Sequence, residues 1–223
     1  MKKSVYSIVL ADDVVAAVDE LAYSMNVSRS DLINRILAER VSLSTPEMRM
    51  QQIFDLIENT MEPRFRFGEQ AQRRISIKSP VRYKYKPTMR YVLEMDRSFE
   101  GRVGRLRASF RTTSEALVNA IDRFFLIWNS VENEELKSVY PDGVPAESGE
   151  GRYERDLYIP GRNGGELLRF VPDSTIAAAV SGYIRLMDSS IQLFFDALSE
   201  GRDCSAEIKK AYRNYIAKGV RII

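Results

Sequence analysis

Residues 7–37 read "SIVLADDVVAAVDELAYSMNVSRSDLINRIL" and contain the clearest structural pattern in the chain. Residues 4–10, which overlap its start, alternate larger and smaller side chains as a β-strand does. Two apolar stripes then recur at helical spacing. Their members are Val14, Val18, Leu21 and Met25, followed by Leu32, Ile33, Ile36 and Leu37. The stretch therefore predicts one strand and two helices.

Short polar side chains mark the ends of both predicted helices. Asp12 or Asp13 can cap the first helix, and Asn26 can adopt the left-handed conformation that ends it. Ser28 and Asp31 have the spacing of a capping box at the start of the second helix. One strand and two short helices cannot enclose a core, so we expect a second copy to complete the fold.

With this order of elements, residues 1–44 resemble the ribbon-helix-helix superfamily, which includes the Arc and MetJ repressors. The resemblance implies a dimer whose paired strands enter the major groove of double-stranded DNA. The base-facing residues that it implies are Val5, Ser7 and Val9. The phosphate contacts that it implies are Lys2, Lys3, Ser28, Arg29 and Ser30. Valine and serine make no bidentate base contacts, so this ribbon would discriminate only weakly between DNA sequences. The alternative is a strand-helix-helix fragment of a larger α/β domain.

When the sequence is aligned with itself at an offset of 85 positions and without gaps, residues 88–131 match the first segment, and Tyr6 aligns with Tyr91. The shift predicts a second strand-helix-helix unit, with its first helix around Phe99 to Phe110. Its base-facing strand positions would be Arg90 and Val92. The sequence leaves open whether the two units pair within one chain or between chains.

Residues 45–87 predict a connecting helix over 46–60 and then a basic tract interleaved with aromatic residues. The tract contains eight Arg or Lys residues and one acid, Glu69, which gives it a net charge of +7. The candidate phosphate contacts here are Arg73, Arg74, Lys78, Arg82 and Lys84. The alternative is the solvated outer face of a small antiparallel sheet.

Residues 132–166 are rich in Pro, Gly and acids and predict a linker with one short strand near 155–160. Residues 167–223 predict helices for self-association or for contact with a protein partner. One inward stripe there comprises Ile208, Tyr212, Tyr215 and Ile216.

Composition limits the functional classes. The 223 residues contain no histidine and one cysteine, so imidazole catalysis and thiolate metal clusters are excluded. No apolar run reaches membrane-spanning length. We expect a mainly α cytoplasmic protein that is not an enzyme and binds no cofactor, metal or membrane. The predicted function is a sequence-specific, repressor-like DNA-binding regulator, acting as a dimer or higher oligomer. The alternative is an adaptor of an antitoxin, partition or relaxosome complex.

Overall fold

The computed structural model describes residues 7–40, 45–68, 70–159, 168–218 and 222. The chain divides into two compact units, Met1–Arg49 and Met50–Ile223. The helix α3 (Pro46–Thr60), which confirms the predicted connecting helix, crosses the boundary between the units.

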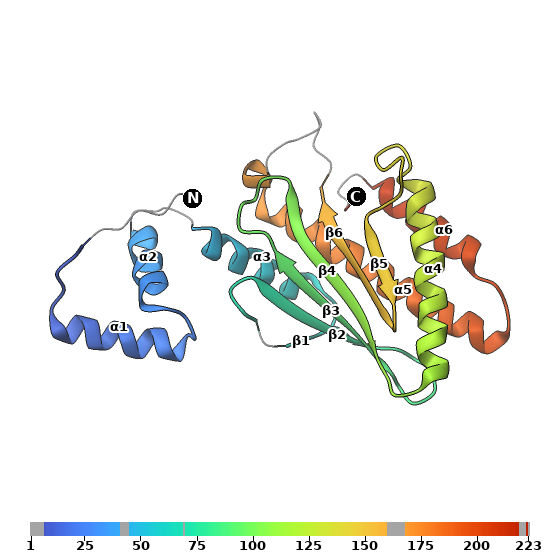
Figure 1. The fold of residues 1–223 in the computed structure, drawn as a ribbon, viewed down its shortest axis with the longest axis horizontal. Helices are drawn as coiled ribbons and strands as arrows, with labels where there is room; N and C mark the ends of the chain where they lie inside the picture. The colour runs from blue at the N-terminus through green and yellow to red at the C-terminus, as the bar shows by residue number, and fades with distance from the viewer. Residues whose placement is uncertain (1–6, 41–44, 69, 160–167, 219–221, 223) are drawn as a thin grey trace. The chain divides into compact units, whose positions relative to one another are not determined.

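The first unit contains, in its described residues, two helices, α1 (Asp12–Ser24) and α2 (Arg29–Arg40) (Figure 1). The predicted end of α1 and start of α2 are confirmed, whereas the N-cap of α1 is Ala11, without a side-chain cap hydrogen bond, and not Asp12 or Asp13. Asn26 has a φ of 53°, and the Oγ of Ser28 accepts a 3.1 Å hydrogen bond from the amide of Asp31. The capping box and the left-handed residue therefore set the turn between the helices.

The strand that was expected before α1 is not found. Residues 7–10 adopt no regular structure, and residues 1–6 lie outside the described ranges. A strand needs a neighbouring strand for its backbone groups, and the described part of the first unit offers none. The prediction of a strand-helix-helix unit is therefore wrong for this part of the chain.

The apolar stripes of α1 and α2 are largely exposed. Among the described residues of the first unit, only Ala22, Leu32, Ala38 and Thr45 are buried. The large exposed apolar side chains of this unit are Ile8, Val9, Leu10, Val14, Leu21, Tyr23, Met25, Ile36 and Leu37. Most of the large apolar side chains described in this unit are therefore exposed.

The second unit is built on a six-stranded antiparallel sheet in the order β1-β2-β3-β4-β6-β5 (Figure 1). Its strands are β1 (Arg66–Phe67), β2 (Arg74–Pro80), β3 (Thr88–Met95), β4 (Arg102–Arg111), β5 (Ala146–Gly149) and β6 (Arg152–Tyr158). Buried and more exposed side chains alternate along β3, as expected when one face of a sheet meets a core and the other meets solvent.

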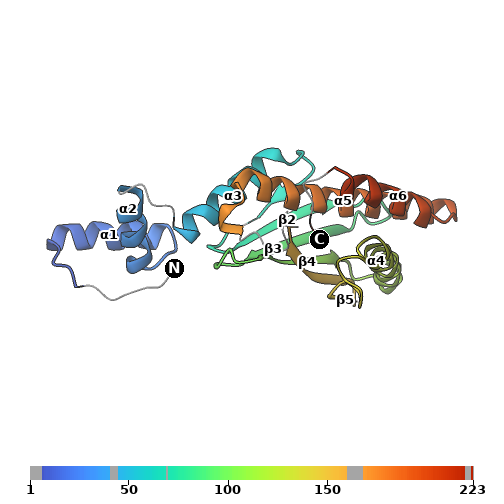
Figure 2. The same cartoon turned by 90° about the horizontal axis from the view of Figure 1, so that it is seen from above.

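Helices cover one face of the sheet (Figure 2). Besides α3 they are α4 (Glu115–Glu135), α5 (Asp173–Glu200) and α6 (Ser205–Ile216), with a short 3₁₀ turn at Leu168–Phe170. Phe195 of α5 stacks on Phe110 of β4 at 5.4 Å between ring centroids, and Phe125 of α4 lies 5.5 Å from Tyr153 of β6. Helices α5 and α6 confirm the predicted helical C-terminal region.

Residues 88–131 do not form a second ribbon-helix-helix unit. They form β3, β4 and the first part of α4, and the segment expected as a helix is the strand β4. Leu106 and Phe110 face inward at even spacing. Gly104 lies so close to β3 that a Cβ there would be 2.8 Å from the Cα of Met95. The fold is therefore α/β, with helices on one face of an antiparallel sheet, and not mainly α.

Residues 132–166, expected as a linker, contribute the hairpin β5–β6 to the sheet. Its two-residue turn is Glu150–Gly151, with φ values of 53° and 72°. Positive φ at both central residues is the geometry that matches the twist of a tight hairpin, and glycine adopts it without strain.

Candidate nucleic-acid interface

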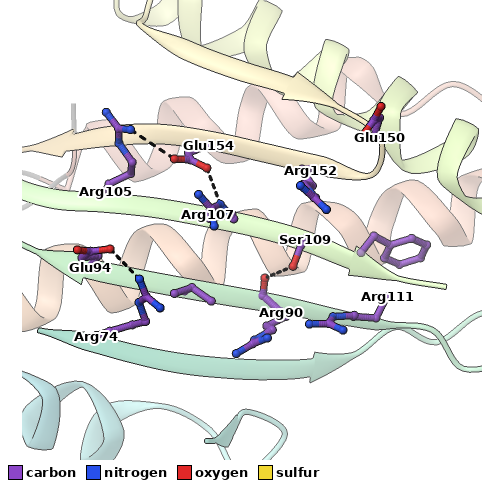
Figure 3. A pocket seen from close by; sticks show the side chains of 12 residues that line it. Arg74, Arg90, Glu94, Arg105, Arg107, Ser109, Arg111, Glu150, Arg152 and Glu154 are labelled. Carbon is purple, nitrogen blue, oxygen red and sulfur yellow. Dashed lines mark hydrogen bonds and ion pairs between the residues drawn. The ribbon is translucent and has the colours of Figure 1, made fainter. Parts of the chain in front are cut away.

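The outer face of the sheet is the face without helices, and its side chains come from alternate positions of adjacent strands. Its basic residues are Arg66, Arg74, Lys78, Arg90, Arg102, Arg105, Arg107, Arg111 and Arg152. Its acidic residues are Glu94, Glu147, Glu154 and Asp156. A depression of about 470 Å³ lies in this face (Figure 3). Basic side chains therefore predominate on the open side of the sheet.

One part of the outer face is occupied by ion pairs, drawn in part in Figure 3. The arginines of these pairs, here called the paired arginines, are Arg74, Arg102, Arg105 and Arg107. Arg105 donates a 2.8 Å hydrogen bond to Asp156, and Arg74 lies 3.1 Å from Glu94. The hydrogen bond from Arg107 lowers the pKa of Glu154. The positive charge of the paired arginines is thus largely neutralised.

A second part of the face lies along one register row that crosses the strands. Backbone pairing links Arg66 to Lys78, Lys78 to Arg90, Arg90 to Ser109 and Ser109 to Arg152. We call its basic residues, Arg66, Lys78, Arg90 and Arg152, the cationic row. None of them forms an ion pair with a carboxylate of the described residues. Figure 3 shows Arg90, Ser109 and Arg152 following one another across β3, β4 and β6.

Two hydroxyl groups support the middle of the cationic row. The Nε of Arg90 donates a 3.0 Å hydrogen bond to the Oγ of Ser76, and Ser109 donates a 3.4 Å bond to the carbonyl oxygen of Arg90. A neutral partner leaves the guanidinium charge intact, so Arg90 is positioned and still able to bind an anion.

The outward residues of β2, β3 and β4 offer cations but no aromatic stacking surfaces. The outward residues of β2, β3 and β4 are Arg74, Ser76, Lys78, Pro80, Thr88, Arg90, Val92, Glu94, Arg105, Arg107, Ser109 and Arg111. None of these is aromatic. Proteins that hold single strands stack bases on aromatic side chains, whereas phosphate groups need only cations and hydrogen-bond donors. The face is chemically suited to a phosphate backbone.

Several residues predicted as DNA contacts lie on this face. Arg90 and Val92 point outward from β3, although from the centre of a sheet and not from a two-stranded ribbon. Arg74 and Lys78 point outward from β2. Sequence analysis identified these positions without identifying the face that they share.

Other predicted contacts are placed differently. Arg73 donates a 3.3 Å hydrogen bond to the carbonyl of Met95. Arg82 and Lys84 are exposed in the loop between β2 and β3. Ser28, Arg29 and Ser30 are exposed in the first unit, where Arg29 forms an ion pair with Asp19. A hydrogen bond from Arg29 to Asp19 raises the pKa of the arginine, so this guanidinium is already engaged by a carboxylate. Ser7 and Val9 are exposed, while Lys2, Lys3 and Val5 lie outside the described residues.

Sequence reasoning missed the basic residues of β4 and β6. In "RLRASFR" (105–111), Arg105, Arg107 and Arg111 alternate with Leu106, Ala108 and Phe110. This is the pattern of a half-buried strand with a basic outer face. It was missed because the same apolar residues also fit a helical repeat.

A buried polar cluster on the inner side of the sheet is the other concentration of charge. The carboxylate of Glu132 on α4 accepts hydrogen bonds from Arg155 at 2.6 Å, Tyr153 at 2.5 Å, Tyr183 at 2.8 Å and Tyr212 at 3.1 Å. Burial, followed by the charge of Glu132, raises the pKa values of the three tyrosines. The cluster ties α4, β6, α5 and α6 together, and we assign it a structural role.

Within the described ranges, no group of three or more acidic or cysteine side chains has the arrangement of a metal site. Also within those ranges, no helix is both long and apolar enough to cross a membrane. Comparison with known protein families, with curated proteins and with solved structures found no match to this chain.

Proposed function

We propose that this protein binds double-stranded DNA through the outer face of its sheet. The observation that carries the proposal is a helix-free sheet face on which outward Arg and Lys residues outnumber acids. Clustered cations bind nucleic acids because each phosphate that they neutralise releases condensed counterions. Such binding is strong at low salt and falls steeply as salt increases.

The absence of outward aromatic residues on β2, β3 and β4 favours duplex over single-stranded DNA. A single strand gains about 1–3 kcal/mol for each base that stacks on an aromatic side chain, and these strands offer no such gain. A duplex presents a regular line of phosphates that needs no stacking. We therefore expect these three strands to favour duplex over single-stranded DNA.

Self-association through the first unit is part of the proposal. The exposed stripe residues Val14, Leu21 and Met25 lie on one face of α1, and Ile36 and Leu37 are exposed on α2. Burying a large apolar side chain contributes about 1.5–3 kcal/mol, so a second copy that covers these stripes would be bound firmly. An oligomer would also present several basic sheet faces to one DNA molecule.

Two biological roles fit this binding mode. A regulator would occupy an operator and would need sequence preference, which direct contacts with base edges would have to supply. An accessory protein of a larger nucleoprotein complex needs only backbone binding. Selection of bound sequences from random DNA separates the roles: enrichment of a shared motif favours the regulator, and salt-sensitive binding without a motif favours the accessory protein.

The test of DNA binding is a salt titration with the full chain. We expect fluorescence anisotropy to show binding to a labelled 20-base-pair duplex that is tighter than binding to either of its strands. The logarithm of the association constant should fall with the logarithm of salt concentration, with a slope of about −3.6 or steeper. A slope near zero, tighter binding to the single strand, or binding to anionic lipid vesicles but not to the duplex would refute the proposal.

A further inference from the structure

We infer that the cationic row is the track followed by one phosphate backbone, which therefore crosses the sheet at right angles to its strands. This inference rests on the proposed function and adds the path of the DNA and the residues that hold it. The path is defined by register: Arg66, Lys78, Arg90 and Arg152 lie on successive or next-but-one strands of one continuous row.

The dimensions of the row suit a phosphate backbone. Neighbouring strands lie about 4.8 Å apart, so the four steps from β1 to β6 span about 19 Å. One strand of duplex DNA presents a phosphate about every 3.4 Å of helix axis, and because the backbone winds around that axis its phosphates are further apart along the track, so about four of them fit that length. Four cations along the row can therefore each reach a separate phosphate within one continuous stretch.

The rows on the Glu94 side are poorer tracks because their charges are already balanced, and the row on the other side, Pro80, Thr88 and Arg111, has one cation only. In the next outward row, Arg107 is followed by Glu154 and then Glu147. In the row beyond it, Glu94 separates Arg74 from Arg105, which is itself paired to Asp156. A phosphate placed there would meet carboxylates, and an arginine would have to give up an existing partner.

Both uncharged positions of the row leave space for a backbone to pass. Ser109 carries a small side chain between Arg90 and Arg152, and its hydroxyl is turned to the carbonyl of Arg90. At the β5 end the row finishes with Gly149, where even an added Cβ would meet no atom within 4 Å. The row thus combines charge along its length with an unobstructed end.

Two variants with equal loss of charge test the track. The row variant is R66Q/K78Q/R90Q/R152Q. The pair variant is R74Q/R102Q/R105Q/R107Q. Each removes four positive charges from the same face of the full chain, and anisotropy with the 20-base-pair duplex measures the salt slope of each. Circular dichroism melts establish that both are folded. The half variant R90Q/R152Q serves as a milder change should the row variant not fold.

We expect the row variant to reduce the magnitude of the salt slope by about 3.6, since each lost phosphate contact contributes about 0.9. The half variant should reduce it by about 1.8 on the same basis. The pair variant should change it by less than about 1, because its arginines already have carboxylate partners. Equal losses in the row and pair variants would overturn the track while leaving DNA binding by the face intact. A natural chain without duplex binding would instead overturn the proposed function itself.

Discussion

Replacing Glu132 by glutamine should be among the most destabilising single changes in the second unit. The side chains of Glu132 and Arg155 are fully buried and lie 2.6 Å apart. The substitution keeps the shape of the side chain but removes its charge, so the guanidinium of Arg155 is left buried without a counter-charge. The amide NH2 group replaces one of the two carboxylate oxygens. At either position this new donor faces another donor, a tyrosine hydroxyl or the guanidinium, in place of the acceptor that was there.

The expected cost follows from breaking a buried ion pair by removal of one partner. Such losses are typically about 3–5 kcal/mol in free energy of unfolding. For a domain of this size, that corresponds to a decrease in melting temperature of roughly 6–20 °C. The double variant Glu132→Leu/Arg155→Met removes both charges and should lose less than the sum of Glu132→Leu and Arg155→Met measured singly, with a coupling energy of at least about 2 kcal/mol.

Urea unfolding followed by tryptophan fluorescence is the appropriate assay. The single tryptophan, Trp128, lies 5.4 Å from the ring of Tyr212 and donates a hydrogen bond to Tyr183, so it reports on the cluster itself. The variant Tyr212→Phe is the matched control, since it removes one 3.1 Å hydrogen bond and no net charge. A loss below about 1 kcal/mol in Glu132→Gln, or additive losses in the double variant, would refute the role given to this pair.

Three further predictions concern the fold, the first unit and pH. Gly104→Ala should destabilise the second unit by about 1–3 kcal/mol in urea unfolding, because its Cβ would press on the backbone of β3; an unchanged midpoint would contradict this. Leu21→Glu should shift the chain towards the monomer in sedimentation velocity if α1 forms the self-association surface; an unchanged distribution would argue against that surface. Burial raises the pKa of Asp188 above its ordinary 3.8. The unfolded chain therefore loses that proton first as pH rises, and the stability of the natural chain relative to Asp188→Asn should fall as pH rises above about 4. A difference that does not vary with pH would contradict this last prediction.

The helices were predictable because caps and stripes are local signals. Pro46 at the start of α3 and the capping box at Ser28 act within a few residues, and the inward stripe of α6 matches its buried residues Ile208, Tyr212 and Tyr215. Whether such a stripe is covered depends on the rest of the molecule. The stripe of α1 has the same kind of spacing and is largely exposed in the first unit.

The strand β4 was mistaken for a helix because two periodicities coincide in it. Phe99, Val103, Leu106 and Phe110 recur every three or four residues, yet Leu106 and Phe110 also alternate with polar neighbours. The gapless match with the N-terminal segment reinforced the helical interpretation. The close approach of Gly104 to β3, which requires a strand here, depends on tertiary structure that one sequence does not show.

The strand β6 was recognised only in part because its inward positions include a charged residue. Tyr153, Arg155 and Leu157 face the core, and an arginine at such a position interrupts the apolar pattern of a strand. Arg155 is tolerated there because Glu132, 23 residues earlier on α4, neutralises it. Long-range pairing of this kind leaves no local signal in the sequence.

The candidate site could be predicted in composition but not in arrangement. The excess of Arg and Lys in residues 64–86 predicted Arg74 and Lys78 as phosphate contacts, with the outer face of a small sheet as the alternative, and both residues point outward from β2. Their alignment with Arg152 required the register of four strand pairs and the presence of β6. A row across a sheet brings together residues that are far apart in sequence, so it can be identified only when the strand order and register are known.

Photo-cross-linking from the centre of the outer face tests the central claim most directly. A photoreactive residue at position 92, where Val92 points outward between β2 and β4, is compared with one at the exposed Leu126 of α4. DNA binding by the sheet predicts that irradiation with a labelled duplex cross-links the chain strongly from position 92 and hardly at all from position 126. Equal cross-linking at both positions, or cross-linking from position 126 alone, would contradict it.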